Sequence, residues 1–391
     1  MTMSDLQAET LPLLFLGDSY RFSDIYHVTR FLTPDAFVTF EQNDERIIVI
    51  GSLDEGRARK ESRATAVINM DAYGAGELAA QAITGHEFIA TVIERFLDHR
   101  GITRVAVPGY FPIGTADHLR AAGVELLVAP HLVERRRAKR PDEIMAIEET
   151  QAATEEAWAL GVEAIRRART DGDGVLLLDG SVFTTEKLRG IIEGALFQRG
   201  CLSEDAIVAP GKQAADPHMI GEGPLRANEA IVMDIFPRHQ RTRYFADMTR
   251  TVSRGEPPRE IVRMYEVVRG AQEEAIAMLK PGVTGREVHE RVEDFIFEAG
   301  YDTLRPGQKR RPGDPVTRGF IHGTGHGVGL ENHEAPSLAR NGTQPLAAGD
   351  VVTIEPGVYD PDIGGVRLED ILVITADGAR NLTRAPKELI V

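Results

Sequence analysis

The sequence contains a single cysteine, Cys201, in 391 residues. An intramolecular disulfide is therefore impossible, and a cysteine-rich metal site is excluded. No apolar run approaches the roughly 20 residues that a membrane helix needs. The run Leu11–Leu16 is also too short for the apolar core of a signal peptide, and it follows acidic rather than basic residues. We therefore expect a soluble, cytoplasmic protein with no membrane partner.

Basic residues are also fewer than acidic ones: the chain has 45 Lys and Arg and 60 Asp and Glu, which gives a net charge of −15. A nucleic-acid-binding domain would normally be basic, so we expect no nucleic-acid partner. Hydrophobic residues make up 42% of the chain and charged residues 27%, which excludes a disordered or fibrous protein. The length predicts two or three domains.

Residues 1–133 alternate apolar, β-rich runs with helical patterns, which predicts a smaller mixed α/β domain. Because this region lacks a glycine-rich phosphate loop and a cluster of catalytic residue types, we interpret it as a structural or oligomerising domain. The predicted strands are 36–41, 46–51, 64–70, 104–107 and 125–128, and the predicted helices are 77–100 and 115–122.

A charge run, Glu134 to Pro141, separates this region from the rest. We interpret residues 134–141 as a solvated linker between domains rather than a nucleic-acid-binding patch. Pro141 suits the first turn of a helix, where a missing N–H costs nothing. The pattern predicts that this helix extends to about residue 169.

Residues 142–391 show a rough internal repeat of a helix pair followed by a β-rich segment. The first half contains helices 141–169 and 185–197 and strands within 229–252. The second half contains helices 259–279 and 284–299 and strands within 320–373. Thr284 and Glu287 have the spacing of a capping box at the start of the last helix. The repeat predicts two similar α+β halves that face each other.

Two aspartates flank a polar turn in the first β-rich segment. Asp234 belongs to an apolar strand, Asp247 to the strand that follows, and their midpoint falls within the turn 237–242. A hairpin folded there would place the two carboxylates opposite each other, with Cβ atoms roughly 5 Å apart. Two like charges in an apolar strand pair destabilise it unless a cation neutralises them.

The second β-rich segment repeats this arrangement with glutamates. Glu355 and Glu369 flank the turn 360–364, and residue 362 is their midpoint. Between the two hairpins lies a glycine-rich stretch with three histidines, His322, His326 and His333. Four carboxylates and an imidazole form a hard, oxygen-rich ligand set that suits two Mn²⁺-like ions.

These motifs resemble those of the pita-bread metallopeptidases, the superfamily of methionine aminopeptidase, aminopeptidase P and prolidase. The resemblance covers residues 140–385, and the first 130 residues resemble, more weakly, the N-terminal domain of the creatinase and prolidase branch. It implies an α+β pita-bread catalytic domain with a pseudo-two-fold repeat. It also implies two divalent ions, Mn²⁺ being expected and Co²⁺ or Zn²⁺ the alternatives, bound by Asp234, Asp247, His326, Glu355 and Glu369. In that family the ligands that match Asp247 and Glu369 bridge both ions.

Other residues favour the prolidase and aminopeptidase P branch. Arg367 matches the arginine of the proline-side pocket, and His322 and His218 match histidines of that branch, with His218 across the cleft from His333. The resemblance implies Glu355 as general base, His322 or His333 as donors to the oxyanion, His218 as a group that orients the substrate, and Arg367 as a partner of a substrate carboxylate. Two positions depart from the family pattern, Phe236 and Met219, and both are expected to reshape the substrate pocket.

The sequence therefore predicts hydrolysis of the Xaa-Pro bond in small peptides with proline at the second position. We favour an Xaa-Pro dipeptidase, with an Xaa-Pro aminopeptidase acting on longer peptides as the alternative and a non-catalytic binding protein as a remote one. Family resemblance also implies a homodimer. The basic stretch 308–312 is interpreted as a solvated loop that could also border the cleft.

Overall fold

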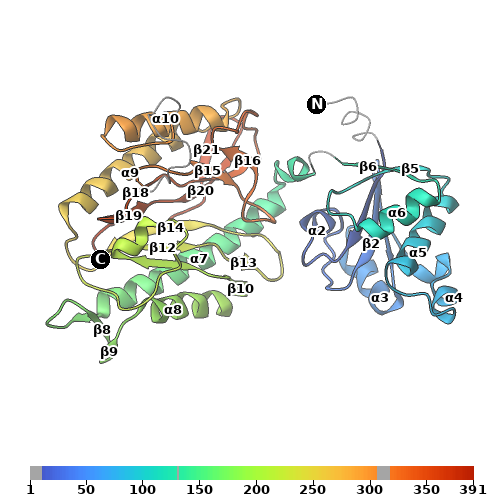
Figure 1. Ribbon diagram of the computed structural model, residues 1–391, viewed down its shortest axis with the longest axis horizontal. Helices are drawn as coiled ribbons and strands as arrows, with labels where there is room; N and C mark the ends of the chain where they lie inside the picture. Colours follow the sequence, from blue (N-terminus) through green and yellow to red (C-terminus); the bar gives the residue numbers. More distant parts are fainter. Residues whose placement is uncertain (1–10, 130–131, 306–317) are drawn as a thin grey trace. The chain divides into compact units, whose positions relative to one another are not determined.

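The computed structural model describes residues 11–129, 132–305 and 318–391 (Figure 1). The chain divides into two compact units, Met1–Arg135 and Arg136–Val391. The basic stretch 308–312 lies outside the described residues. None of the helices in the described ranges combines the length and the apolarity that crossing a membrane requires.

The first unit is built on a six-stranded mixed sheet, in agreement with the predicted α/β class. Its strands β1, β2 and β3 form an antiparallel meander, whereas the pairs β3/β4, β1/β5 and β5/β6 are parallel. In spatial order the strands are β4 (Ala66–Asn69), β3 (Glu45–Ile50), β2 (Phe37–Gln42), β1 (Leu13–Gly17), β5 (Arg104–Val107) and β6 (Glu125–Val128).

Helices cover both faces of this sheet because successive side chains of a strand point to opposite faces. In β2, Val38 and Phe40 pack with α5 and α6, whereas Phe37 packs with α2 and α3. The helices are α2 (Ser23–Thr29), α3 (Ser52–Glu61), α4 (Ala75–Ala80), α5 (Gly85–His99) and α6 (Ile113–Ala121), with a 3₁₀ turn η1 (Met70–Tyr73) before α4.

Three features of this unit differ from the sequence prediction. The apolar run 11–16 overlaps strand β1, which was not predicted, and helices α2 and α3 were not predicted either. The expected single helix 77–100 was wrong, because it is two helices, α4 and α5. Ala82, between them, and Gly85, the first residue of α5, have φ values of 58° and 64°, and this left-handed backbone conformation interrupts a right-handed helix.

The boundary between the two units falls within residues 134–141, but this run is only partly exposed to solvent, unlike the solvated linker that we expected. Arg136 and Lys139 are buried. Lys139 Nζ lies 2.7 Å from Glu334 Oε1, and Arg136 Nη1 lies 3.4 Å from Glu334 Oε2. Arg137 likewise pairs with the buried carboxylate of Asp350 at 2.6 Å. Arg136, Arg137 and Lys139 are therefore paired inside the second unit, whereas Arg135 pairs with Glu41 of the first unit at 2.7 Å. A short 3₁₀ turn, η2 (Val133–Arg136), spans this boundary and leads into the next helix.

The second unit begins with a helix pair packed on an antiparallel sheet. Along α7 (Pro141–Arg167) the buried residues Trp158, Val162 and Ile165 recur at helical spacing and contact the core side of the sheet, where Ile231 and Met233 lie. The other elements of this half are α8 (Thr185–Gln198), β11 (Ile207–Pro210), β12 (Ala230–Ile235) and β14 (Met248–Ser253).

The second half repeats this plan, as the sequence predicted. Helix α10 (Gly285–Glu298) starts with the expected capping box, because Thr284 Oγ1 accepts from Glu287 N at 3.2 Å and Glu287 Oε2 accepts from Thr284 N at 2.7 Å. Together with α9 (Arg259–Met278) it packs on a five-stranded sheet and a two-stranded ladder (Figure 1). These strands are β16 (Glu334–Leu338), β15 (Gly325–Gly327), β17 (Val351–Ile354), β20 (Asp370–Ile374) and β21 (Ala379–Asn381), and the ladder is β18 (Gly357–Asp360) with β19 (Gly364–Arg367).

Short elements complete the unit. Two of them, β10 (Cys201–Leu202) and β13 (Arg238–His239), pair with each other. The remainder are β7 (Arg169–Thr170), β8 (Leu176–Leu178), β9 (Ser181–Val182) and the 3₁₀ helix η3 (Gly211–Ala215). The sheets of the two halves meet at β14 and the β19–β20 segment, where Glu369 N donates to Thr249 O at 3.0 Å.

Candidate active site

The first hairpin differs from its predicted register by two residues. Asp234 lies opposite Thr249, and the pairing continues to Arg238 opposite Phe245. The turn is the loop 240–243, which ends at Arg243 in a left-handed conformation with φ of 67°. Asp247 therefore lies diagonally across from Asp234 rather than directly opposite it, but the period-two alternation keeps both carboxylates on one face.

The second hairpin confirms its predicted register. Ile354 pairs with Asp370 on one side, and Gly357 pairs with Arg367 on the other, so Glu355 and Glu369 fall opposite each other. At this point the backbone N–H groups of the two glutamates donate to other strands instead of to each other. Glu355 N donates to Thr324 O at 2.7 Å, towards β15, and Glu369 N donates to Thr249 O, towards β14.

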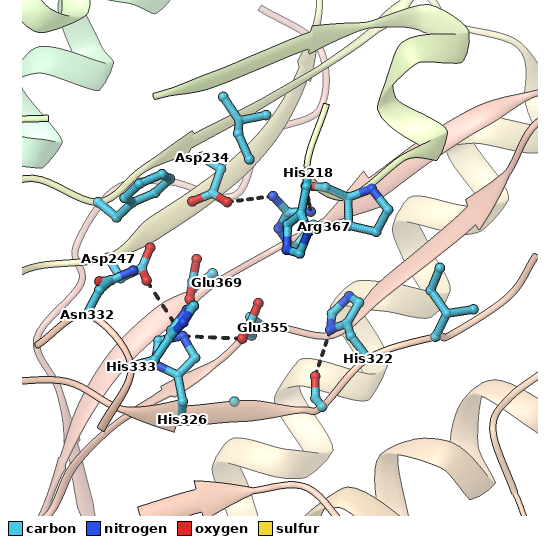
Figure 2. A pocket seen from close by; sticks show the side chains of 16 residues that line it. His218, Asp234, Asp247, His322, His326, Asn332, His333, Glu355, Arg367 and Glu369 are labelled. Carbon is cyan, nitrogen blue, oxygen red and sulfur yellow. Dashed lines mark hydrogen bonds and ion pairs between the residues drawn. The ribbon is translucent and has the colours of Figure 1, made fainter. Parts of the chain in front are cut away.

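The two hairpins and the histidine stretch bring their side chains together (Figure 2). Ligand atoms of Asp234, Asp247 and Glu369 lie within 4.8 Å of one another, and so do those of His326, Glu355 and Glu369. His326 Nε2 is 3.4 Å from Glu355 Oε1 and 3.7 Å from Asp247 Oδ2. Glu369 thus belongs to both groups, and Asp247 lies between Asp234 and the imidazole.

The His326 ring is oriented by the backbone carbonyl of the next residue. Nδ1 lies 3.1 Å from Gly327 O, so Nδ1 carries the proton and Nε2 directs a lone pair at the carboxylates. Burial lowers the pKa of His326 to about 3, with His333 acting in the same direction. A neutral imidazole with a free Nε2 lone pair is the form that ligates a metal.

The acids are buried without enough positive charge to balance them. Burial raises the pKa of Glu369 well above its usual value, and Glu355 and Asp234 raise it further. Burial raises the pKa of Glu355 to about 8, against the opposing effect of Arg367, and the pKa of Asp247 also rises through burial and the charge of Glu369. In addition, three buried oxygens have no hydrogen-bond partner, namely Asp234 Oδ1, Asp247 Oδ1 and Glu369 Oε1. Divalent cations are the chemical species that this donor set fits, because they would compensate the charge and satisfy the oxygens.

Arg367 supplies the nearby positive charge, and protein groups engage its guanidinium. Nη2 donates to Asp234 Oδ2 at 2.6 Å, Nε to Thr249 Oγ1 at 3.2 Å and Nη1 to Tyr359 OH at 3.0 Å. The Thr249 hydroxyl in turn donates to Glu369 Oε2 at 2.8 Å. Sequence reasoning missed Thr249 and Tyr359. Thr249 could have been found by alternation, since it lies two residues after Asp247 on the same face.

The three remaining histidines lie on two sides of the carboxylates. Figure 2 shows His218 and His322 beside Arg367, and His333 beside His326 and Asn332. Burial lowers the pKa of His322 to about 3, so the ring is neutral. Since His322 Nδ1 lies 2.7 Å from Gly323 O and must donate there, Nε2 accepts from Tyr359 OH at 2.9 Å. His333 is exposed, and its ring packs edge-on to that of His326 at 4.2 Å.

All nine predicted site residues line one cavity of about 630 Å³. Of the two departures from the family pattern, Phe236 lines it, whereas Met219 is absent from the described part of its wall. The wall comprises Ile207, Pro217, His218, Asp234, Phe236, Asp247, Ile321, His322, Gly323, Gly325, His326, Asn332, His333, Glu355, Arg367 and Glu369.

Residues 146–376, more than half of the chain, match the family described as metallopeptidase family M24. The chain belongs to this family. Its sequence is 40% identical to the uncharacterized peptidase YqhT of Bacillus subtilis over 189 residues, which is 48% of this chain and 49% of that protein. It is 34% identical to the Xaa-Pro dipeptidase of Lactobacillus delbrueckii subsp. lactis over 255 residues, 64% of this chain and 61% of that one. The chain thus spans about half to three fifths of the length of these curated relatives.

The fold of the whole chain is similar to that of a solved structure of an Xaa-Pro dipeptidase. The Xaa-Pro dipeptidase from Bacillus anthracis superposes with a TM-score of 0.80 at 25% identity, covering 99% of this chain and 96% of that chain. Together with the family match, this similarity confirms an N-terminal mixed α/β domain followed by a C-terminal pita-bread domain.

Proposed function

We propose that this M24 family member is a metal-dependent peptidase that hydrolyses the bond before proline, with Xaa-Pro dipeptides as its substrates. The observation that carries the proposal is the pair of acidic groups that share Glu369, in which three buried carboxylate oxygens lack a partner. We assign Asp234, Asp247, Glu369, His326 and Glu355 as ligands of two divalent cations, with Mn²⁺ expected and Co²⁺ or Zn²⁺ as alternatives. Proline preference is supported by the dipeptidase name of the Lactobacillus relative.

The side chains around these ligands have different roles in the proposed reaction. Bound cations would lower the pKa of a water and stabilise negative charge on the carbonyl oxygen. Glu355, as a carboxylate beside the bound cations, accepts the proton of the attacking water. His333 donates to the carbonyl oxygen, because Nε2 of the neutral His322 is committed to Tyr359. His218 orients the proline side, where the imide nitrogen has no proton and needs no acceptor.

One observation favours the second candidate, an Xaa-Pro aminopeptidase that acts on longer peptides. Among the described residues of the cavity wall, Arg367 is the only arginine or lysine, and its guanidinium already donates to Asp234, Thr249 and Tyr359. A dipeptide brings a free carboxylate next to its proline, whereas a longer peptide brings an amide that needs no cation.

The test compares Ala-Pro with Ala-Pro-Ala after dialysis against chelator and addition of Mn²⁺, with Ala-Ala as a control for proline specificity. We expect no activity without metal, Mn²⁺-dependent cleavage of Ala-Pro, and losses of several orders of magnitude in Asp247→Asn and Glu369→Gln. Faster cleavage of Ala-Pro-Ala would select the aminopeptidase, and full activity after exhaustive chelation would exclude the metal-dependent mechanism. Homodimerisation and a cytoplasmic location stay predictions, and light scattering tests the first.

A further inference from the structure

A second cavity of about 390 Å³ shares Phe236, Asn332 and His333 with the wall of the first. It therefore adjoins the candidate metal centre on the side of Asn332, away from Arg367 and His322 (Figure 2). A dipeptide whose scissile bond lies at the ligands extends to both sides. If its proline occupies the Arg367 side, the side chain of the preceding residue lies at the second cavity.

The wall of this cavity combines apolar side chains with one arginine. Leu202, Phe236 and Phe245 provide the apolar surface. Arg238 is held among them by two pairings, because β13 places it opposite Leu202 in β10 and an isolated bridge places it opposite Phe245. Its guanidinium lies 5.5 Å from the centre of the Phe245 ring. This distance is within the range of a cation–π contact, which places the guanidinium at the wall of the cavity.

Arg238 is partly removed from water without a matching anion. Among the described residues, no carboxylate oxygen lies within 4.0 Å of its guanidinium. Burial lowers the pKa of Arg238, and Glu204 opposes that effect only from a distance. Glu204 and Asp205 also line the cavity, but both are exposed to solvent. A charge that has lost hydration and lacks a partner binds an incoming anion with a larger gain than an exposed one does.

We propose that Arg238 determines specificity and that the enzyme prefers substrates with an acidic residue before proline, Glu-Pro and Asp-Pro. The carboxylate of that residue accepts hydrogen bonds from the guanidinium, while its methylene groups contact Phe236 and Phe245. The inference rests on the proposed function, because it assumes that an Xaa-Pro bond lies at the metal ligands.

The experiment compares kcat/KM for Glu-Pro, for its neutral isostere Gln-Pro and for Lys-Pro with the Mn²⁺-loaded full-length protein. We expect wild type to prefer Glu-Pro to Gln-Pro by about 10-fold or more, the range of a charge-assisted hydrogen bond. Arg238→Gln should abolish this preference and leave Gln-Pro within about twofold. Arg238→Lys should retain part of it, and Arg238→Glu should shift the preference to Lys-Pro. Arg241→Gln, in the exposed loop of the same hairpin, is the matched control and should behave as wild type.

Each other outcome is decisive. Equal losses on Glu-Pro and Gln-Pro in Arg238→Gln, or no preference in wild type, would overturn the role of Arg238 while the proposed function stands. A wild-type preference for Lys-Pro that disappears in Glu204→Gln would also overturn it, and would show that the exposed acids Glu204 and Asp205 determine the substrate preference. If no Xaa-Pro peptide is cleaved with Mn²⁺, both the proposed function and this inference fall.

Discussion

Replacement of Arg367 by alanine distinguishes two roles for this side chain, one as the partner of a substrate carboxylate and the other as the partner of Asp234. The structure favours the second, because the guanidinium is buried and donates to Asp234 at 2.6 Å. Removing one member of a buried ion pair costs about 3–5 kcal/mol, since the other charge stays uncompensated. Here that charge also faces Asp247 and Glu369, which adds repulsion between like charges.

For a unit of this size, about 1 kcal/mol shifts the Tm by roughly 2–4 °C, so Arg367→Ala should lower the Tm by about 10 °C without metal. Saturating Mn²⁺ should reduce the difference, because a ligand at about 1,000 times its Kd stabilises by about 4 kcal/mol and compensates the same carboxylates. In kinetics, kcat should fall in parallel for Ala-Pro and Ala-Pro-Ala. Arg318→Ala removes an exposed arginine that pairs with Asp360, and this control should change neither quantity.

The opposite pattern would refute this reasoning. If Arg367→Ala raises KM for Ala-Pro at least tenfold while the Tm and the kinetics on Ala-Pro-Ala stay unchanged, the guanidinium binds the free carboxylate of a dipeptide. That result would also favour the dipeptidase over the aminopeptidase. Arg367→Lys sharpens the test, because lysine keeps the charge beside Asp234 but cannot also donate to Thr249 and Tyr359.

Three further predictions concern the support of the site. Lys139→Met should lower the stability in urea unfolding by at most about 3–5 kcal/mol, because it removes the nearer of the two cations paired with the buried carboxylate of Glu334, and a second substitution, Glu334→Leu, should recover part of the loss. Burial lowers the pKa of His289 from 6.5 to about 4, so the unfolded chain binds more protons than the folded one between these pH values. The stability therefore falls as the pH drops through this range, by at most about 1.4 kcal/mol per pH unit. In His289→Gln this part of the pH dependence should disappear from urea midpoints measured at pH 7, 6 and 5. Gln272→Met should cost about 1–3 kcal/mol for each of the two backbone carbonyls that lose their donor and should lower kcat, whereas Gln198→Met, on an exposed helix end, should leave Tm and kcat unchanged. An unchanged Tm in Gln272→Met would show that the amide bridge does not support the site.

The site ligands could be found from the sequence because they combine rare features, such as carboxylates within apolar strands on either side of a turn. The spacing located the second hairpin correctly, since its strands are symmetric about residue 362. It misplaced the first, because pairing continues through Arg238 and Phe245 and the left-handed Arg243 closes a four-residue loop. A midpoint fixes the register only when the type of turn is known.

The errors in the first unit and at its boundary have other causes. The break between α4 and α5 depends on backbone conformation at Ala82, a residue that gives no signal of a left-handed φ. The burial of Lys139 depends on Glu334, which lies almost 200 residues further along the chain. A charge run is usually solvated, and only tertiary structure reveals the acids that bury it.

The opening in the second hairpin explains why carboxylates from one ladder serve a site between two halves. Pro356 has no N–H to donate, so the ladder cannot continue unbroken past Glu355. The backbone N–H of Glu355 instead donates to Thr324 O, beside β15, and that of Glu369 to Thr249 O in β14, so the two residues are hydrogen-bonded to the histidine stretch and to the aspartate hairpin respectively. The amide Nε2 of Gln272, on α9, donates to Ile354 O at 2.9 Å and Leu368 O at 3.1 Å and so satisfies carbonyls on both strands. A helix of the second half thus stabilises an interruption in its own sheet, and that interruption allows Glu369 to lie within ligand distance of groups from both halves.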